Sequence, residues 1–314
     1  MMNRYCVMGL FVSLLSYGLT ASAQPLVYGG NIESTEWQIS GSVFECRFEQ
    51  TIPRYGRAVF YHQAGEDVRF QLWAQRNLMA YSAAQVSILP PPWQPSVRSE
   101  RLGTVTIADD APLLMLDTQR TQQFMHALLE GKWPTIAHYT HYDRQRFVKV
   151  HLSAVQFDEP YRDYLACVDQ LLPMNFNQVA RSRVLFGLGK EAPDDDDMAL
   201  LDRIVFYVQN DPRVFAIYLD GHSDNIGRRY DNRQLSKARA EQVERYFINR
   251  GIDPDMITTR FHGSRYPIAS NETARGRAEN RRVTIRLEQR DDMDIPEHLR
   301  FQRPPRPRLN TAAE

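Results

Sequence analysis

The chain has no net formal charge, because its 38 lysine and arginine residues balance 38 aspartate and glutamate residues. A neutral balance removes the global attraction to nucleic acid that a strongly basic protein has. The sequence also lacks the H-E-x-x-H, paired-cysteine, G-x-S-x-G and EF-hand patterns that mark zinc, serine-hydrolase and calcium sites. We therefore expect no cofactor, no metal and no enzymatic activity.

Long hydrophobic runs are also scarce, and the one near the N-terminus is short. Arg4 precedes an apolar stretch from Val7 to Leu19, and the small residues Ala21-Ser22-Ala23 precede Gln24. This order is typical of a secretory signal peptide, and an apolar stretch of about a dozen residues is short of the roughly 20 that span a bilayer. We expect a signal peptide over residues 1–23 and a periplasmic mature protein, with an uncleaved anchor as the alternative. No cysteine follows the cleavage site, which argues against lipid attachment.

Cysteine is rare, with three residues in the whole chain. Cys6 lies in the expected signal peptide, so the mature protein keeps Cys46 and Cys167. Two cysteines in an oxidising compartment can form only one intramolecular bridge. We predict the disulfide Cys46–Cys167, and two buried free thiols are the alternative.

Residues 24–172 predict a β-rich domain with two helices. Apolar and polar residues alternate around Cys46, Phe70 and Val150, as in strands that bury one face. The first helix would be capped by Thr118 or Thr121 and end before Gly131, and the second would run from about Glu159 to Leu172 with Cys167 on it. The apolar face of the first helix would comprise Phe124, Met125, Leu128 and Leu129.

The pattern of apolar and polar residues changes after Pro173. Residues 173–290 predict an α/β sandwich, with one sheet covered by two helices on one face. The four acids Asp194–Asp197 would begin the first helix by complementing its positive end, an interpretation preferred to a calcium site. Ser236 would cap the second helix. The expected strands are Arg183–Leu188, Val214–Leu219, Ile257–His262 and Val283–Leu287. From Asp291 to residue 314 the chain is rich in proline and arginine, and we expect a disordered tail.

The most informative segment runs from Leu219 to Ala240 and is completed by Gly276–Arg282. Asp224 directly follows a predicted strand, and Arg239 lies on the following helix, 239 − 224 = 15 residues later. A carboxylate and a guanidinium in one pocket suit a ligand with one amino group and one carboxylate, such as an amino acid. A salt bridge that only holds the fold is the alternative for such a pair.

This pattern resembles the peptidoglycan-binding domain of the OmpA-like family. The resemblance implies that Asp224 pairs with the ammonium group of diaminopimelate, an amino acid of Gram-negative peptidoglycan, and that Arg239 holds its carboxylate. It also implies pocket positions for Ser223, Gly227 and Asn232. Supporting positions would be Leu235, Asn280, Arg281 and Arg282. Ser223 replaces the usual threonine, and Phe261–Pro267 follows the family's G-Y-G-x-x-x-P only loosely.

The first half carries a second resemblance, through Trp37, Phe44-Glu45-Cys46, Ile52–Phe60 and Pro90-Pro91-Pro92-Trp93. These elements resemble the periplasmic T-ring components of polar flagellar motors. The resemblance implies a non-catalytic, ring-forming scaffold. Residues 24–172 would join the basal-body rings and help to recruit the stator, while residues 173–290 would grip the cell wall. Trp93 would either cap a local core or contact a ring partner.

Two other functions stay open. The first is an outer-membrane or envelope-anchoring OmpA-like protein unrelated to motility, with a barrel as its first half, which the two helices and the cysteine pair disfavour. The second is a wall-remodelling enzyme. His222, Asp224 and Ser236 offer a weak triad or zinc pattern, but no oxyanion loop or further ligand accompanies them.

Overall fold

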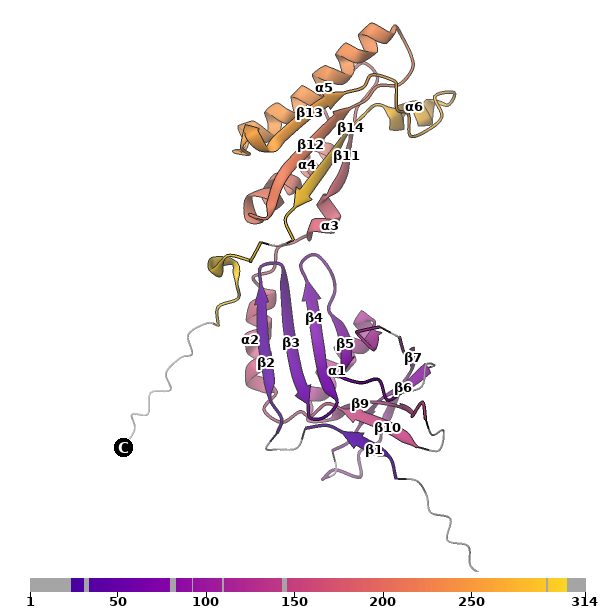
Figure 1. Ribbon diagram of the computed structural model, residues 1–314, viewed down its shortest axis with the longest axis vertical. Coiled ribbons are helices and arrows are strands. Elements are labelled where there is room, and N and C mark those ends of the chain that lie inside the picture. Colours follow the sequence, from indigo (N-terminus) through magenta and orange to yellow (C-terminus); the bar gives the residue numbers. More distant parts are fainter. Residues whose placement is uncertain are drawn as a thin grey trace, which may run out of the picture.

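The computed structural model describes residues 24–30, 34–79, 83–91, 93–108, 110–142, 146–291 and 293–303. The expected signal peptide, residues 1–23, lies outside the described residues. Two lobes follow one another along the long axis of the molecule (Figure 1), and each has its own cluster of buried apolar side chains. None of the helices in the described ranges has the length and hydropathy needed to cross a membrane.

The first lobe is built on two five-stranded sheets around one core. The predicted alternation around Cys46 is confirmed, because Phe44, Cys46 and Phe48 are buried while Arg47 is exposed. The first sheet has the order β2 (Trp37–Ser42), β3 (Glu45–Ile52), β4 (Gly56–Gln63), β5 (Arg69–Ala74) and β8 (Leu114–Leu116). The second has the order β1 (Leu26–Tyr28), β10 (Phe147–His151), β9 (Trp133–Tyr139), β6 (Ala83–Leu89) and β7 (Glu100–Thr106).

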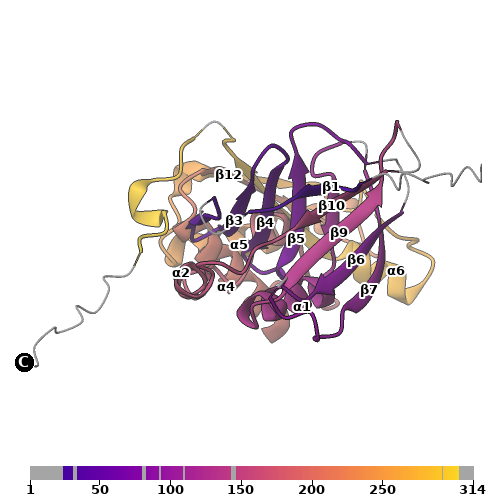
Figure 2. The same ribbon diagram turned by 90° about the horizontal axis from the view of Figure 1, so that it is seen from below.

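Two helices, α1 (Thr118–Leu129) and α2 (Asp158–Val168), complete this lobe, and α1 lies beside β9 and β5 (Figure 2). The β-rich domain with two helices is therefore confirmed. The predicted cap of α1 is wrong. Asp117 caps the helix through a 2.9 Å bond from the Arg120 amide, and buried Thr121 instead accepts a bond from the Phe70 amide.

The predicted buried face of α1 is too wide, because Leu129 at the end of the helix is 45% exposed. Leu165 on α2 is equally exposed. Helix α2 also ends at Val168, and Leu172 beyond it donates its amide to the Val43 carbonyl. Each helix buries only the stripe that meets a sheet, which is narrower than its apolar pattern.

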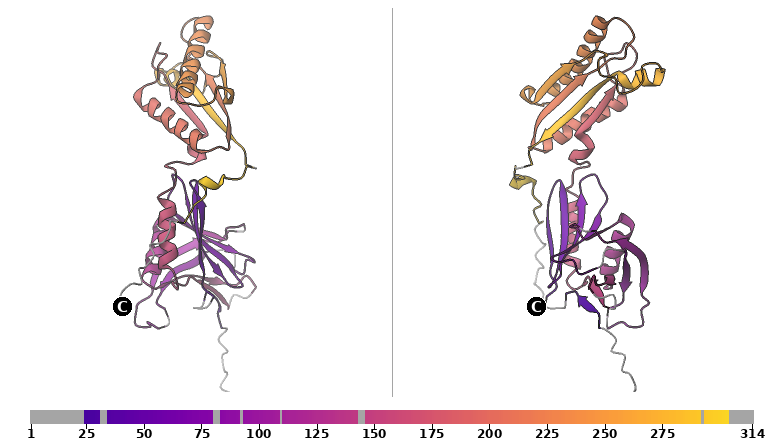
Figure 3. Two further views of the ribbon diagram at one scale, coloured as in Figure 1. Left: turned by 90° about the vertical axis from the view of Figure 1, so that its left-hand side faces the viewer. Right: turned by 45° about the vertical axis from the view of Figure 1, so that its right-hand side comes forward.

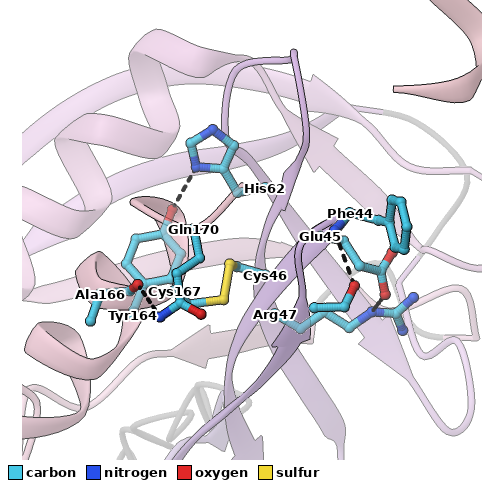
Figure 4. Close-up of a disulfide and its surroundings, with 10 residues drawn as sticks. Phe44, Glu45, Cys46, Arg47, His62, Tyr164, Ala166, Cys167 and Gln170 are labelled. Atoms are coloured by element: carbon cyan, nitrogen blue, oxygen red, sulfur yellow. Dashed lines mark hydrogen bonds and ion pairs between the residues drawn. A yellow bond between two sulfur atoms is a disulfide. The ribbon is translucent and has the colours of Figure 1, made fainter. Parts of the chain in front are cut away.

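The disulfide Cys46–Cys167 is present, with both residues fully buried and their Cα atoms 6.1 Å apart. Figure 4 shows the bridge between β3 and α2, with the Tyr164 hydroxyl hydrogen-bonded to His62 beside it. The bridge closes a loop of 121 residues and attaches the end of the first lobe to its beginning.

The second lobe is one sheet with two helices on one face, as the sequence predicts. Its strand order is β11 (Arg181–Leu185), β14 (Arg282–Gln289), β12 (Val214–Gly221) and β13 (Ile257–Phe261). Helix α4 (Asp195–Asn210) joins β11 to β12, and α5 (Arg229–Asn249) joins β12 to β13. Both connections move in the same direction across the sheet, so right-handed crossovers put both helices on the same face (Figure 3, left). Helix α6 (Ala274–Asn280) lies in the connection from β13 to β14.

The helix starts were predicted with mixed success. Asp194 caps α4 by accepting the Asp197 amide at 3.0 Å, with three further acids in the first turn, as expected. The cap predicted at Ser236 is wrong, because α5 begins two turns earlier, at Arg229. Ser236 is fully buried inside the helix, where its hydroxyl donates to the Arg233 carbonyl and accepts the Gly263 amide.

The lobes are joined by direct contacts around the short helix α3 (Phe176–Val179). Asn175 caps this helix and donates to Glu66 at 2.9 Å, and Gln178 donates to the Gly65 carbonyl at 2.9 Å. Phe44, at the tip of the β2–β3 hairpin, packs with Tyr207 and lies 4.4 Å beneath the Arg213 guanidinium. The predicted domain boundary at Pro173 is thus followed at once by residues that hold the two lobes in direct contact.

The expectation of disorder from residue 291 is wrong for residues 293–303. This segment returns to the first lobe, where the Phe301 amide donates to Gly41 and the Val43 amide to Leu299. Arg303 forms a 2.8 Å ion pair with Asp163 of α2. Strand β2 is an edge of its sheet, and these contacts pair with backbone groups at its end, from Gly41 to Val43. This pairing uses backbone groups and requires no periodic pattern of apolar residues. The sequence pattern therefore did not predict it.

We expect the double substitution Cys46→Ala/Cys167→Ala to lower the free energy of unfolding by about 3–5 kcal/mol, because the bridge restricts a long loop in the unfolded chain. Urea unfolding of the oxidised wild type and the variant measures the difference. Reduction of wild type should shift its transition to that of the variant, and an unchanged transition would show that the bridge does not stabilise the fold.

Candidate functional site

The Asp224 side chain lies at the carboxyl end of β12 and is 4% exposed. One carboxylate oxygen accepts the Ile226 amide at 3.1 Å, and the other accepts a charged bond from Arg281 Nη1 at 3.0 Å. Arg281 directly follows α6, so this ion pair ties two loops of the second lobe. Arg281, expected only to support the site, thus contacts Asp224 directly.

The Arg239 side chain projects from α5 and is fully buried. Its guanidinium donates to the carbonyls of Lys190 at 2.9 Å, Gly187 at 3.2 Å and His222 at 3.3 Å. Three of its five N–H groups are thereby used, and two remain. Burial, and to a smaller extent the neighbouring Arg281, lowers the pKa of Arg239 to about 10, so it is charged at neutral pH.

The buried cluster Asp224–Arg239–Arg281 therefore holds one negative and two positive groups. The charge of Asp224 acts on Arg239, yet the three hydrogen bonds that Arg239 donates go to backbone carbonyls rather than to a carboxylate. The excess positive charge is complementary to an anion, and Asp224 is complementary to a cation. The fold thus brings together Asp224 and Arg239, the two groups that the sequence pattern singled out.

Glycine is required at two places in this scaffold. A Cβ on Gly221 would lie 2.1 Å from the Ser236 carbonyl oxygen, so β12 can meet α5 this closely only without a side chain. Gly227, in the loop after Asp224, has φ of +96°, a conformation that favours glycine. Ser223 donates its hydroxyl to the Asp224 carbonyl and its amide to the Gly263 carbonyl, which fixes the loop from the other side.

The remaining predicted residues hold the surrounding loops. Asn280 is fully buried and makes four hydrogen bonds, to Ile268, Asn271 and both backbone groups of Ala269. Arg282 donates to the Tyr266 carbonyl at 3.1 Å. Asn232 is buried in the first turns of α5, and Leu235 is half-buried.

Comparison with known families matches each lobe separately. Residues 28–173 match the model of the MotY N-terminal domain, and residues 185–281 match that of the OmpA family. The chain is a MotY-type domain joined to an OmpA-family domain. Neither family is catalytic, which agrees with the expectation that the chain is not an enzyme.

Individual relatives follow the same division. The sodium-type flagellar protein MotY of Vibrio parahaemolyticus is 26% identical over 290 residues, which is 91% of this chain and 98% of that protein. Outer membrane protein A of Bordetella avium is 37% identical over 37% of this chain and 59% of that protein. The peptidoglycan-binding protein ArfA of Mycobacterium tuberculosis is 36% identical over 38% of this chain and 36% of that protein. The chain thus spans less than two thirds of the length of these last two relatives.

Among solved structures, the C-terminal domain of Helicobacter pylori MotB is 28% identical and covers 35% of this chain and 86% of that chain, with a TM-score of 0.33.

Trp93 of the MotY-type domain is 61% exposed. Its ring lies 6.0 Å from that of Trp133, edge to face, and Trp133 stacks on His151 at 4.3 Å. The three rings line a pocket of about 380 Å³. Trp93 therefore contacts a local aromatic cluster and also presents most of its surface to solvent, and its contact with a ring partner stays a prediction.

His222, two residues before Asp224 in the chain, is 5% exposed, and its ring stacks on that of His262 at 5.1 Å. The His262 ring is in turn hydrogen-bonded to Asp220 at 2.8 Å. His222 Nδ1 is buried and has no hydrogen-bond partner among the residues that the structure describes. Burial, assisted by the charge of Arg282, lowers the pKa of His222 to about 4. The folded protein therefore keeps this ring neutral through the mildly acidic range.

We expect His222 to make stability depend on pH. Between pH 6.5 and 4 the unfolded chain takes up a proton at this residue and the folded chain does not. The contribution of His222 to the free energy of unfolding therefore falls by about 3 kcal/mol as the pH decreases, and it changes no further below pH 4. Chemical denaturation across this range should show the decline in wild type and a shallower one in His222→Gln. Equal slopes in the two proteins would contradict the assignment.

Proposed function

We propose that this protein is a non-catalytic, periplasmic component of the flagellar motor that binds peptidoglycan through its OmpA-family domain. Two observations support the proposal. The similarity to the flagellar protein MotY extends over 91% of the chain, and therefore includes both domains. The second domain holds a buried cluster with both charge signs, Asp224, Arg239 and Arg281.

The ligand of this cluster is diaminopimelate in a peptide stem of the wall. Its free amino-acid end carries an ammonium and a carboxylate close together. The ammonium replaces Arg281 at the Asp224 carboxylate, and the carboxylate is bound by the two N–H groups that Arg239 has left. Both partners are desolvated, which strengthens charged hydrogen bonds relative to water.

Access to Arg239 involves the loop between β11 and α4. Its carbonyls at Gly187 and Lys190 bind the guanidinium, and Leu188 between them is 74% exposed. Gly189 has φ of +69°, so the loop turns without a side chain at that position. A small displacement of residues 187–190 exposes the guanidinium without moving the sheet.

In the motor, the MotY-type domain joins a ring around the basal body and helps to recruit or anchor the stator. The aromatic pocket at Trp93 is its candidate contact with a ring partner. Torque requires a fixed reference, and the covalent wall supplies one. Modest affinity for each stem is sufficient, because a ring presents many copies to many stems at once.

We expect Asp224→Asn to weaken co-sedimentation with purified sacculi about tenfold or more, since the neutral amide loses a charged hydrogen bond worth about 1.5–3 kcal/mol. The matched control is Asp231→Asn, which removes a carboxylate that pairs with Arg228 on the surface of α5. The control should bind within twofold of wild type, and both variants should keep the wild-type melting temperature within a few degrees.

Motility separates the motor role from wall binding. Cells that carry Asp224→Asn in place of wild type should assemble flagella and swim poorly, because the ring is no longer fixed to the wall. Normal swimming of a strain that lacks the gene would contradict the motor role. Sacculus binding by the wild-type protein that Asp224→Asn abolishes would then favour an envelope-anchoring protein unrelated to motility.

A further inference from the structure

A second pocket, of about 180 Å³, lies between the start of α5 and the loop after β13. Three arginines line it: Arg229 and Arg233 from α5, and Arg265 from the loop. All three are exposed, and His262 and Phe261 form part of the wall. The Arg233 guanidinium lies 4.8 Å from the centre of the Phe261 ring, which holds it beside the opening.

None of these three arginines makes a salt bridge with any residue that the structure describes, although nearby arginines do. Arg228, one residue before α5, pairs with Asp231 at 2.7 Å, and Arg275 pairs with Glu279 at 3.5 Å. Arg229 and Arg233 are four residues apart on one helix, so their like charges repel. Three cations thus share a small pocket without an acid of their own.

The position on the helix adds to the positive potential. The first turn of a helix carries partial positive charge, which favours acids there and disfavours arginine. Helix α5 nevertheless begins at Arg229, with Arg228 at its N-cap position and no side-chain cap, and the acid in its first turn, Asp231, pairs with Arg228. On the pocket wall, His262 is bonded to the Asp220 carboxylate. This charge pattern is unfavourable for the isolated protein and favourable for one that binds an anion.

Two hydrogen bonds connect this pocket to the site of Asp224. The Gly263 carbonyl, on the pocket wall, accepts the Ser223 amide at 3.0 Å, and the Gly263 amide donates to Ser236 at 3.0 Å. Ser223 immediately precedes Asp224 in the chain. The loop that carries Asp224 is therefore bonded directly to the wall of the arginine pocket.

We propose that Arg229, Arg233 and Arg265 form a separate carboxylate subsite, which binds a further free carboxylate of the same wall peptide. This inference rests on the proposed function, because the peptide that enters at Asp224 carries the carboxylate. Guanidinium groups bind a carboxylate through two parallel hydrogen bonds, and three of them around one pocket provide this geometry from several sides. The subsite extends recognition from the amino-acid end of the stem to the peptide beyond it.

The test compares two probes on the full chain. Free diaminopimelate fills only the Asp224 site, whereas a soluble muropeptide with a tetrapeptide stem reaches both sites. Binding is measured by calorimetry or by amide chemical shifts. We expect Arg233→Gln/Arg265→Gln to weaken muropeptide binding about tenfold and to leave diaminopimelate binding within twofold of wild type. The matched control is Arg228→Gln, which removes a neighbouring charge that does not line the pocket.

The outcomes are distinct. Equal muropeptide affinity for the double variant and wild type would overturn the subsite and leave the proposed function standing. An equal loss for both probes would mean that the arginines serve the amino-acid end itself, which also overturns a separate subsite. If wild type binds neither probe, the proposed function fails and this inference falls with it. Melting curves of the variants confirm that the exposed substitutions leave the fold intact.

Discussion

The organisation of the second lobe depends on a guanidinium that the fold buries completely, that of Arg239. Such a group stays charged at neutral pH, and burying a charge is costly unless polar groups replace its water. The protein supplies three backbone carbonyls, two from the β11–α4 loop and one from the end of β12. The positions of these loops relative to α5 follow from this requirement. A single side chain thus connects three elements at the carboxyl edge of the sheet.

The same requirement gives the site its chemistry. Because the carbonyls solvate Arg239 without neutralising it, its charge remains available to an anion, and Asp224 nearby is held by Arg281. Asp224 and Arg239 are therefore both held in place before a ligand arrives, and binding in the proposed mode displaces Arg281 and residues 187–190 around them. The MotY-type domain adds a different kind of surface, an aromatic pocket around Trp93 and Trp133. Between these two surfaces, the disulfide attaches α2 to β3, the contacts around α3 join the two lobes, and residues 293–303 bind the end of β2.

Most of the fold follows from patterns that lie within one element. The alternation around Cys46, the acidic cap at Asp194 and the strand–helix order after Pro173 are local, and each was predicted from sequence. The disulfide was predictable because the expected mature chain has only two cysteines. Ser236 was misread because a serine before an apolar run also occurs in helix interiors, where it can bond a distant loop amide such as that of Gly263. The return of residues 293–303 to β2 was missed because backbone pairing at a sheet edge leaves no apolar period.

The site was predicted less completely than the fold. The sequence pattern correctly predicts that Asp224 and Arg239 lie close together. The partner of Asp224 in the free protein is Arg281, however, and no local pattern tells which of the two adjacent arginines reaches Asp224. The arginine pocket was not foreseen, because Arg229, Arg233 and Arg265 belong to two segments that meet only in the folded lobe.

The central claim is that the cluster Asp224–Arg239–Arg281 receives the amino-acid end of a wall peptide. A crystal structure of the protein with a muropeptide that contains diaminopimelate tests this most directly. The account predicts the ligand ammonium at Asp224 in place of Arg281, and the ligand carboxylate against Arg239 with residues 187–190 displaced. A bound muropeptide that leaves the Asp224–Arg281 ion pair and the carbonyl contacts of Arg239 unchanged would contradict it.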